Sequence, residues 1–387
     1  MLLEADFPPD VRVEKEAMSL ISKGHQVTVA SYTFQNDKRT ENLDGITILR
    51  KKISKFRYKS SIGALRFPFY FNFWRRYLGE IFRTNSIDVI HIHDLPLAKI
   101  GVETRKKYNI PFILDLHENY PALLDISTHT KKILAKFTYS YNDWRKYEQK
   151  MIRLADYVIC VVEEMKQRLV DFGLSPGKVF VLENTPILNT SQIAHAKPED
   201  GKVTLVYSGG INRHRGLQVV IAGLPKIRKK IHGIRLWIIG SGNYQPVLEK
   251  LISEYHVGDI VTFFGWKSRE EMNELLMQSD ITLIPHLKTD HSDHTFPNKL
   301  HEYALINKPV VSSDCNPLIR MVEEMQNGII YKNDSPDDFA AAVIKLLESG
   351  DYVEMGTKGK KWVVKKYNWT VTEKTLFRLY DQIGNKS

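Results

Sequence analysis

Short apolar runs alternate with longer amphipathic segments along most of the chain. The apolar runs are rich in β-branched residues, and most of them are separated by segments in which apolar residues recur about every 3.6 positions, as in helices. Alternating strands and helices predict parallel βαβ units and doubly wound α/β sheets. The expected strands are 26–32, 46–50, 88–93, 111–117, 156–162, 203–208, 235–242, 260–265, 280–285 and 327–331. The expected helices include 13–24, one from Gly216, 268–278, one from Pro297, and 370–383.

The alternating pattern stops and restarts once, at a stretch rich in Pro, Asn, Thr and Ser that predicts a linker. A chain of 387 residues is also long enough for two domains. The expected division is a first domain over 1–185, a linker over 186–202, a second domain over 203–366 and a final helical segment over 367–387. The first strand, at 1–5, is short for a central strand, which suggests a truncated N-terminus.

The composition, 43% hydrophobic and 26% charged, is that of a globular protein. The opening MLLEADFPPD lacks the basic start and apolar run of a signal peptide. No later run reaches the roughly 18 apolar residues of a membrane span. The only cysteines, Cys160 and Cys315, lie in or beside apolar runs, as in a reduced cytosolic protein. These features predict a cytoplasmic protein.

A net charge of +10 predicts an anionic partner: nucleic acid, a phosphorylated small molecule or an acidic membrane. Residues 51–76 contain many Lys and Arg side chains and no acid, interleaved with aromatic residues. This segment suits a membrane surface, a core of aromatics with solvated lysines, or single-stranded nucleic acid. We favour peripheral contact with the inner face of the cell membrane over nucleic acid. The residues expected to make it are Arg57, Lys59, Phe73, Trp74, Arg75 and Arg76.

Polar residues that follow strands are the first candidates for a site, because ligands of open α/β sheets bind beyond the carboxyl ends of the strands. In 207–217, YSGGINRHRGL, the glycines permit close approach of a ligand, and Arg213 and Arg215 stand beside a helix start that suits a diphosphate. A tight turn with solvated arginines explains this pattern equally well. A plain turn is the better explanation of 240–242, GSG.

The stretch 294–311, HTFPNKLHEYALINKPVV, combines polar chemistry with a helix start. Pro297 suits the first helical position, so that the following amides and Lys299 would form an anion site. Glu302, one turn further on, suits the vicinal hydroxyls of a ribose. The combination predicts a sugar-nucleotide site, against the alternative of a carboxylate that complements the helix dipole beside a solvated lysine.

Histidines and acids follow two strands of the first half. His117 and Glu118 end one strand, and a histidine there can position an acceptor hydroxyl or stabilise developing charge. His93 and Asp94 end another, where a structural role is the stronger interpretation. The His and Asp residues of 286–294 indicate a polar substrate loop rather than a metal site, because no credible helix brings two of them together.

These motifs resemble the retaining glycosyltransferases of family 4, which have the GT-B fold of two Rossmann-like domains facing across a cleft. The resemblance runs over nearly the full length, in segments 7–29, 88–94, 115–121, 155–169, 207–217, 261–286, 297–311 and 367–369. It implies that the C-terminal domain binds the nucleotide sugar and the N-terminal domain presents the acceptor. It also implies that the last helix crosses back to the N-terminal domain.

The resemblance also assigns individual residues. Arg215 falls at the family's diphosphate lysine, Glu302 at its ribose-binding glutamate, and His117 at a histidine near the transferred sugar. His294 stands where the family has a second glutamate, and glycines replace a phosphate arginine for which Arg213 would substitute, which indicates a subfamily with a PNKL motif. The donor-binding residues expected from pattern and resemblance are Gly209, Gly210, Arg213, Arg215, Gly240, Phe264, Gly265, His294, Pro297, Asn298, Lys299 and Glu302.

The expected reaction transfers a glycosyl group from a nucleoside diphosphate sugar to an acceptor hydroxyl with retained configuration, without a metal or other cofactor. The acceptor is expected to be a lipid-linked or polysaccharide intermediate at the membrane. Arg215 and Lys299 would stabilise the leaving diphosphate, and His117 would orient the sugar or the acceptor. His93, Asp94, His117 and Glu118 are the expected acceptor-side residues. The alternatives are a nucleotide-sugar epimerase of the same fold and a non-catalytic partner of another transferase.

Overall fold

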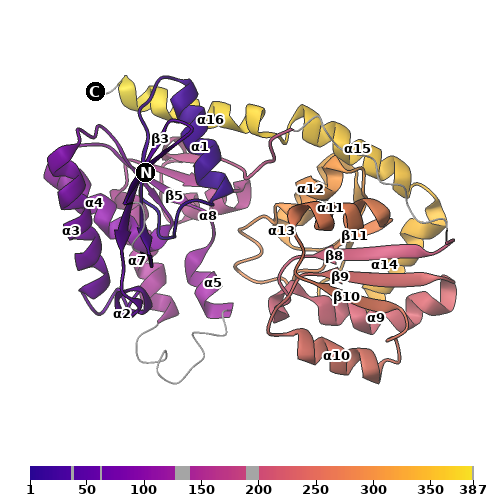
Figure 1. The fold of residues 1–387 in the computed structure, drawn as a ribbon. Helices are drawn as coiled ribbons and strands as arrows, with labels where there is room; N and C mark the ends of the chain where they lie inside the picture. The colour runs from indigo at the N-terminus through magenta and orange to yellow at the C-terminus, as the bar shows by residue number, and fades with distance from the viewer. Residues whose placement is uncertain (36–38, 62, 127–139, 189–199, 386–387) are drawn as a thin grey trace. The chain divides into compact units, whose positions relative to one another are not determined.

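The computed structural model describes residues 1–35, 39–61, 63–126, 140–188 and 200–385. The chain forms two compact units, Met1–Asn184 together with the residues from Thr372 onward, and Thr185–Val371. Each unit is built of helices around parallel strands (Figure 1), which confirms the predicted α/β, Rossmann-like architecture. Of the expected linker at 186–202, residues 189–199 lie outside the described part of the chain.

The strands of the first unit form two ladders, in the orders β1-β3-β2 and β4-β5-β6-β7, and all pairs are parallel except β2 with β3. Leu2 makes parallel bridges to Ala30 of β1 and Ile92 of β4, so the first residues of the chain lie between the two ladders. The strands are β1 (Thr28–Thr33), β2 (Thr40–Leu43), β3 (Ile46–Lys52), β4 (Ile90–His93), β5 (Phe112–Leu116), β6 (Tyr157–Cys160) and β7 (Val179–Val181).

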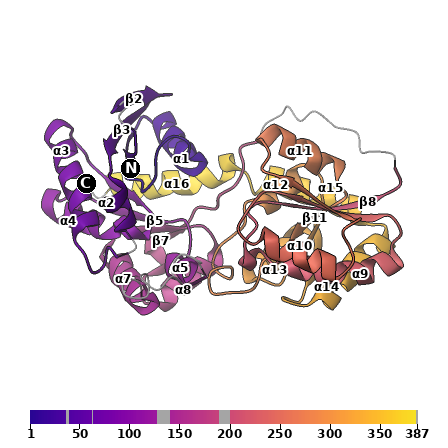
Figure 2. The same cartoon turned by 60° about the horizontal axis from the view of Figure 1, so that its bottom comes forward.

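The final helix, α16, packs beside α1 of the first unit in both ribbon views (Figures 1 and 2). The Ser19 hydroxyl donates to Glu373 Oε2 at 2.7 Å, and the ammonium of Lys23 lies 4.7 Å from the centre of the Phe377 ring. The helices are α1 (Val11–Ser22), α2 (Lys55–Lys59), α3 (Phe69–Thr84), α4 (Ala98–Tyr108), α5 (Tyr120–Ile126), α7 (Tyr141–Leu154), α8 (Glu163–Asp171) and α16 (Trp369–Gly384).

The second unit holds one parallel sheet of order β10-β9-β8-β11-β12-β13. Its inner strands are buried on both faces, which is why they read as continuous apolar runs in the sequence. The strands are β8 (Val203–Ser208), β9 (Ile234–Ile239), β10 (Val261–Gly265), β11 (Ile281–Ile284), β12 (Val310–Ser313) and β13 (Gly328–Tyr331).

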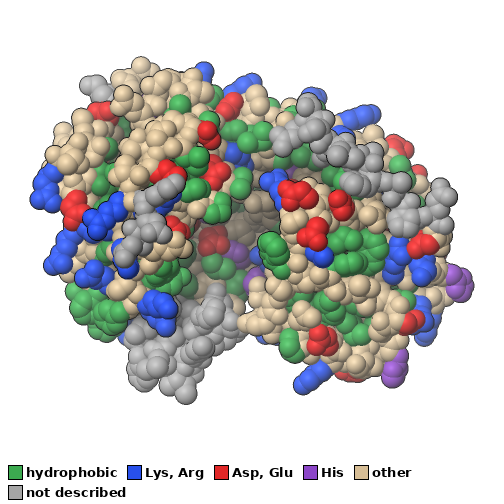
Figure 3. Space-filling view, in the orientation of Figure 1, with side chains coloured by type: hydrophobic (Ala, Val, Ile, Leu, Met, Phe, Trp, Pro, Cys, Tyr) green, Lys and Arg blue, Asp and Glu red, His purple; other side chains and the backbone are tan. Residues whose placement is uncertain are grey.

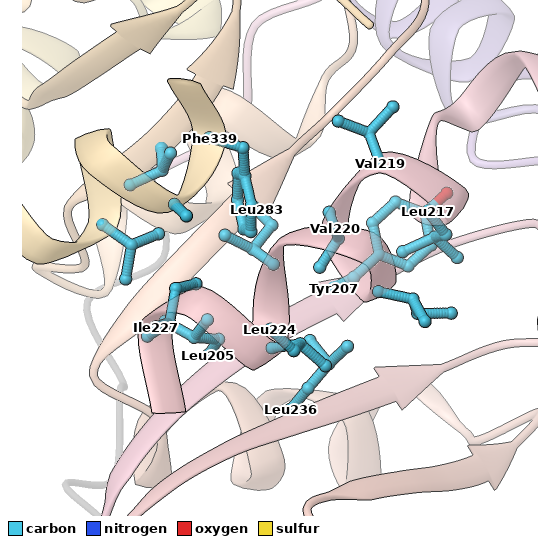
Figure 4. Close-up of a cluster of buried hydrophobic side chains, with 14 of the residues drawn as sticks. Leu205, Tyr207, Leu217, Val219, Val220, Leu224, Ile227, Leu236, Leu283 and Phe339 are labelled. Carbon is cyan, nitrogen blue, oxygen red and sulfur yellow. The ribbon is translucent and has the colours of Figure 1, made fainter. Parts of the chain in front are cut away.

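Helices cover both faces of this sheet, with α11 and α12 on one side and α9 and α10 on the other (Figure 1). Leu205, Leu224 and Phe339 belong to the core beneath α9 and α14 (Figure 4), and a second core lies under α11, α12 and α13. The helices are α9 (Leu217–Lys230), α10 (Gln245–Glu254), α11 (Arg269–Gln278), α12 (Lys299–Leu305), α13 (Asn316–Met325), α14 (Pro336–Ser349) and α15 (Tyr352–Lys365).

Candidate functional site

In the second unit, the side chain of Lys299 reaches from the start of α12 to the carboxyl end of β8. Its ammonium donates to the Ser208 carbonyl at 2.5 Å and lies 4.2 Å from the centre of the Tyr207 ring. The next residue, Gly209, has φ 135°, and a Cβ built there would lie only 2.8 Å from the Lys299 Nζ. The absence of a side chain at position 209 therefore leaves the ammonium accessible beside the β8 turn.

Arg215 lies at the same edge of the sheet, in a 3-10 turn at Arg213–Arg215 between β8 and α9. Its Nη1 is 3.0 Å from Nε2 of His286, which follows β11. Burial and the Arg215 charge hold the pKa of His286 well below its usual range, so its ring is neutral. Because a guanidinium can only donate, the His286 Nε2 is the acceptor of this hydrogen bond. Within the described chain, the buried Nε of Arg215 has no hydrogen-bond partner.

Arg215, Lys299, His214 and His286 form a cluster that we call the cationic cluster. Burial and the Arg215 charge lower the pKa of Lys299 to about 7, and Glu302 opposes the shift. Burial and the same arginine lower the pKa of His214 to about 4. At neutral pH the fixed charge is therefore that of Arg215, and the Lys299 ammonium is half titrated. An anion bound here would hold that proton, because it would offset the repulsion from Arg215.

The glycines of this edge serve two different purposes. A Cβ at Gly240 would lie 2.0 Å from the Gly209 carbonyl oxygen, so packing between two turns of the protein itself explains that glycine. Gly210 is exposed, and Gly265 has nothing within 4 Å of its Cβ position. Gly265 therefore borders open space, whereas the missing side chain at Gly209 leaves room for the Lys299 ammonium.

The expected start of the motif helix was wrong. α12 begins at Lys299, so Pro297 lies in the preceding loop rather than at the first helical position. The amide of Leu300 already donates to the Pro297 carbonyl at 3.1 Å, and that of His301 to the Asn298 carbonyl at 3.1 Å. These two amides are thus engaged within the helix start, and the Lys299 side chain is the group of this motif that reaches the β8 turn.

The other expected donor residues lie around the same edge without joining the cluster. Arg213 and Glu302 are exposed. His294 is partly buried in the loop before α12, where its Nδ1 lies 2.8 Å from the Asp290 carbonyl. Phe264 is partly buried, with its ring 5.4 Å from that of Trp237 in the core. The structure thus brings Gly209, Arg215 and Lys299 together and leaves Glu302 facing solvent.

The first unit holds a buried ion-pair network at the carboxyl ends of β4 and β5. Two nitrogens of Arg12, from α1, face the two carboxylate oxygens of Asp115 at 2.9 and 3.1 Å. Arg12 Nε also lies 3.0 Å from Glu16 Oε1, one turn further along α1. Asp115 and Glu16 are fully buried. Burial opposes charge on Asp115, but Arg12 and His117 hold its pKa well below the usual range.

His117 lies between two carboxylates at the exposed end of this network. Its Nε2 is 3.1 Å from Asp115 Oδ2, and its Nδ1 is 3.5 Å from Asp94 Oδ2. Burial alone would lower its pKa, but Asp94 and Asp115 overcome that effect and raise the pKa to about 9. The side chain keeps 19% of its surface exposed. His117 is therefore a positively charged, oriented hydrogen-bond donor at neutral pH.

Glu16, His91, His93 and Asp115 place one possible metal-ligand atom each within 4.8 Å of one another. This donor set fits a metal poorly, because the Arg12 guanidinium already lies against both carboxylates. Burial and the Asp115 charge raise the pKa of Glu16 to about 8, so at neutral pH it is mostly a protonated acid. The Arg12 guanidinium is therefore the cation that faces the carboxylates of this network.

The acceptor-side residues stay a prediction, with one exception. His93 was wrongly placed there, because its side chain is fully buried and its Nδ1 lies 3.1 Å from His117 Nε2. Asp94 and Glu118 are partly exposed. Asp94 adopts φ 69°, unusual for a residue with a side chain, and its Oδ1 accepts from the His117 amide at 3.2 Å. His117, Asp94 and Glu118 remain as candidate contacts.

The membrane-contact expectation was wrong for two residues. Phe73 and Trp74 are 4% and 0% exposed and belong to the buried face of α3. Arg75 pairs with Glu103 through two bonds of 2.6 and 2.7 Å. The exposed aromatic residues nearby are Phe56, Phe67 and Phe69, beside the exposed Arg57 and Lys59. In Figure 3, Lys and Arg side chains gather around hydrophobic ones over α2 and α3.

Sequence reasoning missed Arg12 and Glu16, and it noted Asp115 without giving it a role. Arg12 and Glu16 are one helical turn apart on the buried face of α1, beside Val13, Ala17 and Leu20, and an opposite-charge pair among these apolar positions is the signal that was available. In the described part of the chain, every helix is too short or too polar to span a bilayer.

Two family models match adjoining parts of the chain. "Glycosyltransferase Family 4" matches residues 11–185 and "Glycosyl transferases group 1" matches residues 189–362. Together with the two Rossmann-like units and the cationic cluster, they define the protein as a glycosyltransferase. The first half of the chain matches the family 4 model, the second half matches the group 1 model, and the chain has the GT-B fold, in agreement with the resemblance of its motifs. The PNKL subfamily stays a prediction.

Relatives and solved structures match over almost the whole chain. An uncharacterized glycosyltransferase of Methanocaldococcus jannaschii is 24% identical over 94% of this chain and 91% of its own. A phosphatidyl-myo-inositol mannosyltransferase of Mycolicibacterium smegmatis is 22% identical over 98% and 92%. Sucrose-phosphate synthase of Thermosynechococcus elongatus has TM-score 0.78 at 17% identity, over 99% and 95%. Anabaena HepE in complex with UDP and glucose has TM-score 0.71 at 14% identity, over 98% of each chain. The two structures establish the fold.

Proposed function

We propose that this glycosyltransferase takes its sugar from a nucleoside diphosphate sugar, bound by its diphosphate at the cationic cluster. The observation that carries the proposal is the convergence of Arg215 and Lys299 beside the side-chain-free Gly209. A diphosphate would supply the negative charge that these groups lack within the protein. The structural likeness to HepE, whose structure contains UDP and glucose, supports this class of donor.

The proposed reaction proceeds with retained configuration and needs no metal ion. Charge builds up on the diphosphate oxygen as the glycosyl bond breaks, and Arg215 and protonated Lys299 would stabilise it through charge-assisted hydrogen bonds. The leaving oxygen would take the proton of the attacking hydroxyl on the same face. His117, fixed as a cation by Asp94 and Asp115, would donate a hydrogen bond to the transferred sugar or the acceptor.

The proposed acceptor is lipid-linked or part of a glycan at a membrane surface. The exposed Phe56, Phe67 and Phe69, with Arg57 and Lys59, form what we call the basic aromatic patch. The Phe67 and Phe69 rings stack at 6.3 Å, and Phe56 lies 5.8 Å from Phe69. Such a patch suits the interface of an anionic bilayer. The name of the mycolicibacterial relative, a phosphatidyl-myo-inositol mannosyltransferase, supports a lipid acceptor.

A thermal-shift screen across UDP-, GDP-, ADP- and CMP-sugars tests the donor class. A ligand that binds only the folded chain adds about 2.7 kcal/mol of stability at one hundred times its Kd. We expect at least one sugar nucleotide to raise the melting temperature by several degrees, and the matching free sugar to leave it unchanged. No shift with any of them, at millimolar concentration, would contradict the proposed donor class.

A further inference from the structure

Arg215 differs from other bonded arginines of the chain in the partner that holds its guanidinium. Five arginines of the described chain place two nitrogens against one carboxylate, namely Arg12, Arg75, Arg105, Arg168 and Arg228. Arg215 instead donates from Nη1 to the His286 ring at 3.0 Å, and no carboxylate of the described residues pairs with it. A carboxylate offsets the charge of a guanidinium, whereas a neutral ring leaves that charge in place.

The backbone of His286 is held by donors from two neighbouring strand ends. Its carbonyl oxygen accepts from the Ser313 hydroxyl at 2.6 Å, at the end of β12, and from Asn333 Nδ2 at 2.9 Å, after β13. Asn333 is itself fixed, because its amide donates to Asp314 Oδ1 at 3.0 Å. The whole residue is 6% exposed. Packing and hydrogen bonds of this kind hold a side chain in one orientation.

The turn between β8 and α9 packs directly on the residues that flank His286. The strand β11 lies beside β8 in the sheet (Figure 1). The Leu287 amide donates to the His214 carbonyl at 2.9 Å. A Cβ at Gly216 would lie 1.6 Å from the Pro285 carbonyl oxygen, so the two segments touch through their backbones. The imidazole and the guanidinium that it meets therefore keep a fixed relative position.

The surroundings of the His286 ring keep it neutral. Burial lowers its pKa most, and Arg215, Lys299, His214 and His291 lower it further. The ring therefore carries one proton, and since Nε2 accepts from the arginine, that proton is on Nδ1. A glutamate at this position would also accept from the arginine, but it would offset the charge that attracts a diphosphate.

We propose that His286 is a positioning residue of the donor site, whose neutral ring orients the Arg215 guanidinium and leaves its full positive charge for the donor diphosphate. The inference rests on the proposed donor site and gives a reason why an imidazole, rather than a carboxylate, holds the arginine. It also concerns Lys299, whose pKa is lowered to about 7 by burial and by the Arg215 charge. A carboxylate at position 286 would offset the second of these two effects and raise the pKa of Lys299.

The test compares glutamine with glutamate at position 286, because the two side chains have nearly the same shape and differ in charge. Calorimetry on the full-length chain with UDP-glucose, GDP-mannose and ADP-glucose first finds the best-bound sugar nucleotide. His286→Gln should stay within a few-fold of the wild-type affinity, since its amide oxygen can accept from Arg215. His286→Ala should bind about tenfold more weakly, and His286→Glu about 100-fold or more. His232→Glu controls for added negative charge and should bind as the wild type does, because His232 is exposed and precedes β9, whereas the cluster follows the strands.

The pH dependence of binding separates lost charge from a disturbed structure. In the wild type, binding should weaken as pH rises through about 7, because Lys299 loses its proton. In His286→Glu the raised pKa of Lys299 should move this loss to higher pH, whereas His286→Gln should leave it in place. A substitution that only disturbed the packing would weaken binding equally at every pH. Nitrogen-15 NMR of the wild type is an independent readout and should show a neutral His286 ring from pH 6 to 9, with its proton on Nδ1.

Three outcomes would overturn the inference and leave the donor proposal intact. Equal affinities of His286→Gln and His286→Glu would mean that charge at this position does not matter. Wild-type affinity in His286→Ala would mean that Arg215 needs no orienting partner. A positively charged His286 ring at neutral pH would contradict the inference directly, and this result does not depend on whether the glutamate variant folds. If the wild type binds none of the sugar nucleotides, the proposed donor site fails, and the role of His286 fails with it.

Discussion

Both units collect ionisable side chains at the carboxyl ends of parallel strands, but the two collections are opposite in kind. In the first unit, Arg12 and Asp115 are mutually paired and buried before any ligand arrives. In the second, burial and the Arg215 charge lower the pKa of Lys299, and the exposed Glu302 is the carboxylate that opposes this shift. The first arrangement orients the side chain of His117, whereas the second is the site at which we propose that an anion binds.

The largest effect is expected when the buried ion pair of Arg12 and Asp115 is broken. Asp115→Asn leaves the Arg12 guanidinium buried without its main counter-charge, which should cost about 3–5 kcal/mol of unfolding free energy. Urea unfolding measures it. The matched control is Asp259→Asn, because Asp259 forms a similar two-bond pair with Arg228 on the surface, where about 1 kcal/mol or less is expected. Equal losses at the two positions would mean that Asp115 is not the centre of a buried network.

The next largest effect is expected when the fixed positive charge of Arg215 is removed from the cationic cluster. Arg215→Ala should lower kcat for glycosyl transfer roughly 100- to 1000-fold, as expected when a group that stabilises developing charge is lost. The unfolding midpoint should change little, because among the described residues Arg215 is bonded to His286 and forms no ion pair with a carboxylate. Arg228→Ala serves as control and should leave the transfer rate unchanged. A variant at position 215 with normal kcat would refute the proposed role of the cluster.

Apolar runs along the chain predict most of the strands, but they miss a strand whose residues are polar. The ten strands predicted from residue 26 onward appear within about three residues of their expected ends, because buried parallel strands are continuous apolar runs. The expected first strand at 1–5 was wrong, since only isolated bridges at Leu2 are present there. The strand β2 was missed, since its sequence, TENL, is polar and mostly exposed. The local sequence pattern therefore predicted the buried strands, and it missed a strand that is exposed and held by pairing with β3.

The same limit of local sequence pattern applies to the membrane-contact residues and to the two groups of ionisable side chains. Phe73 and Trp74 were assigned to a membrane from composition, although their helical spacing with Tyr70, Tyr77 and Ile81 marks one buried face. The pairing of Arg12 with Asp115 joins residues 103 positions apart, and no local pattern shows it. Gly209, Arg215 and Lys299 could be predicted to lie close together because all three follow strands whose carboxyl ends meet at one edge.

The pH dependence of donor binding tests the role of the Lys299 charge in the cationic cluster. Its lowered pKa, about 7, means that it is protonated below pH 7 and neutral above. Binding of a nucleoside diphosphate sugar, whose diphosphate keeps its charge over this range, should therefore weaken as pH rises through 7, by up to about tenfold per pH unit for one linked proton. Calorimetry from pH 6 to 9 measures the slope. Lys299→Arg should flatten it, because the guanidinium stays charged, and an unchanged slope in that variant would assign the proton to another group.

The smallest expected effect concerns the basic aromatic patch. Arg57→Ala should weaken binding to vesicles that contain phosphatidylglycerol about fivefold, since a basic residue near an anionic surface contributes about 1 kcal/mol. Co-sedimentation at low salt measures it. Lys361→Ala, an exposed lysine of the second unit, should have no effect. Equal retention by vesicles of pure phosphatidylcholine would argue against an electrostatic contribution.

The most direct test of the proposed reaction follows the anomeric proton by NMR while the chain cleaves its donor, with the acceptor or with water in its place. The account predicts that the donor identified by thermal shift yields a free nucleoside diphosphate and a first-formed sugar of the same anomeric configuration as in the donor. A first-formed sugar of the opposite configuration would contradict same-face departure and attack, and a bound donor that is never cleaved would contradict glycosyl transfer itself.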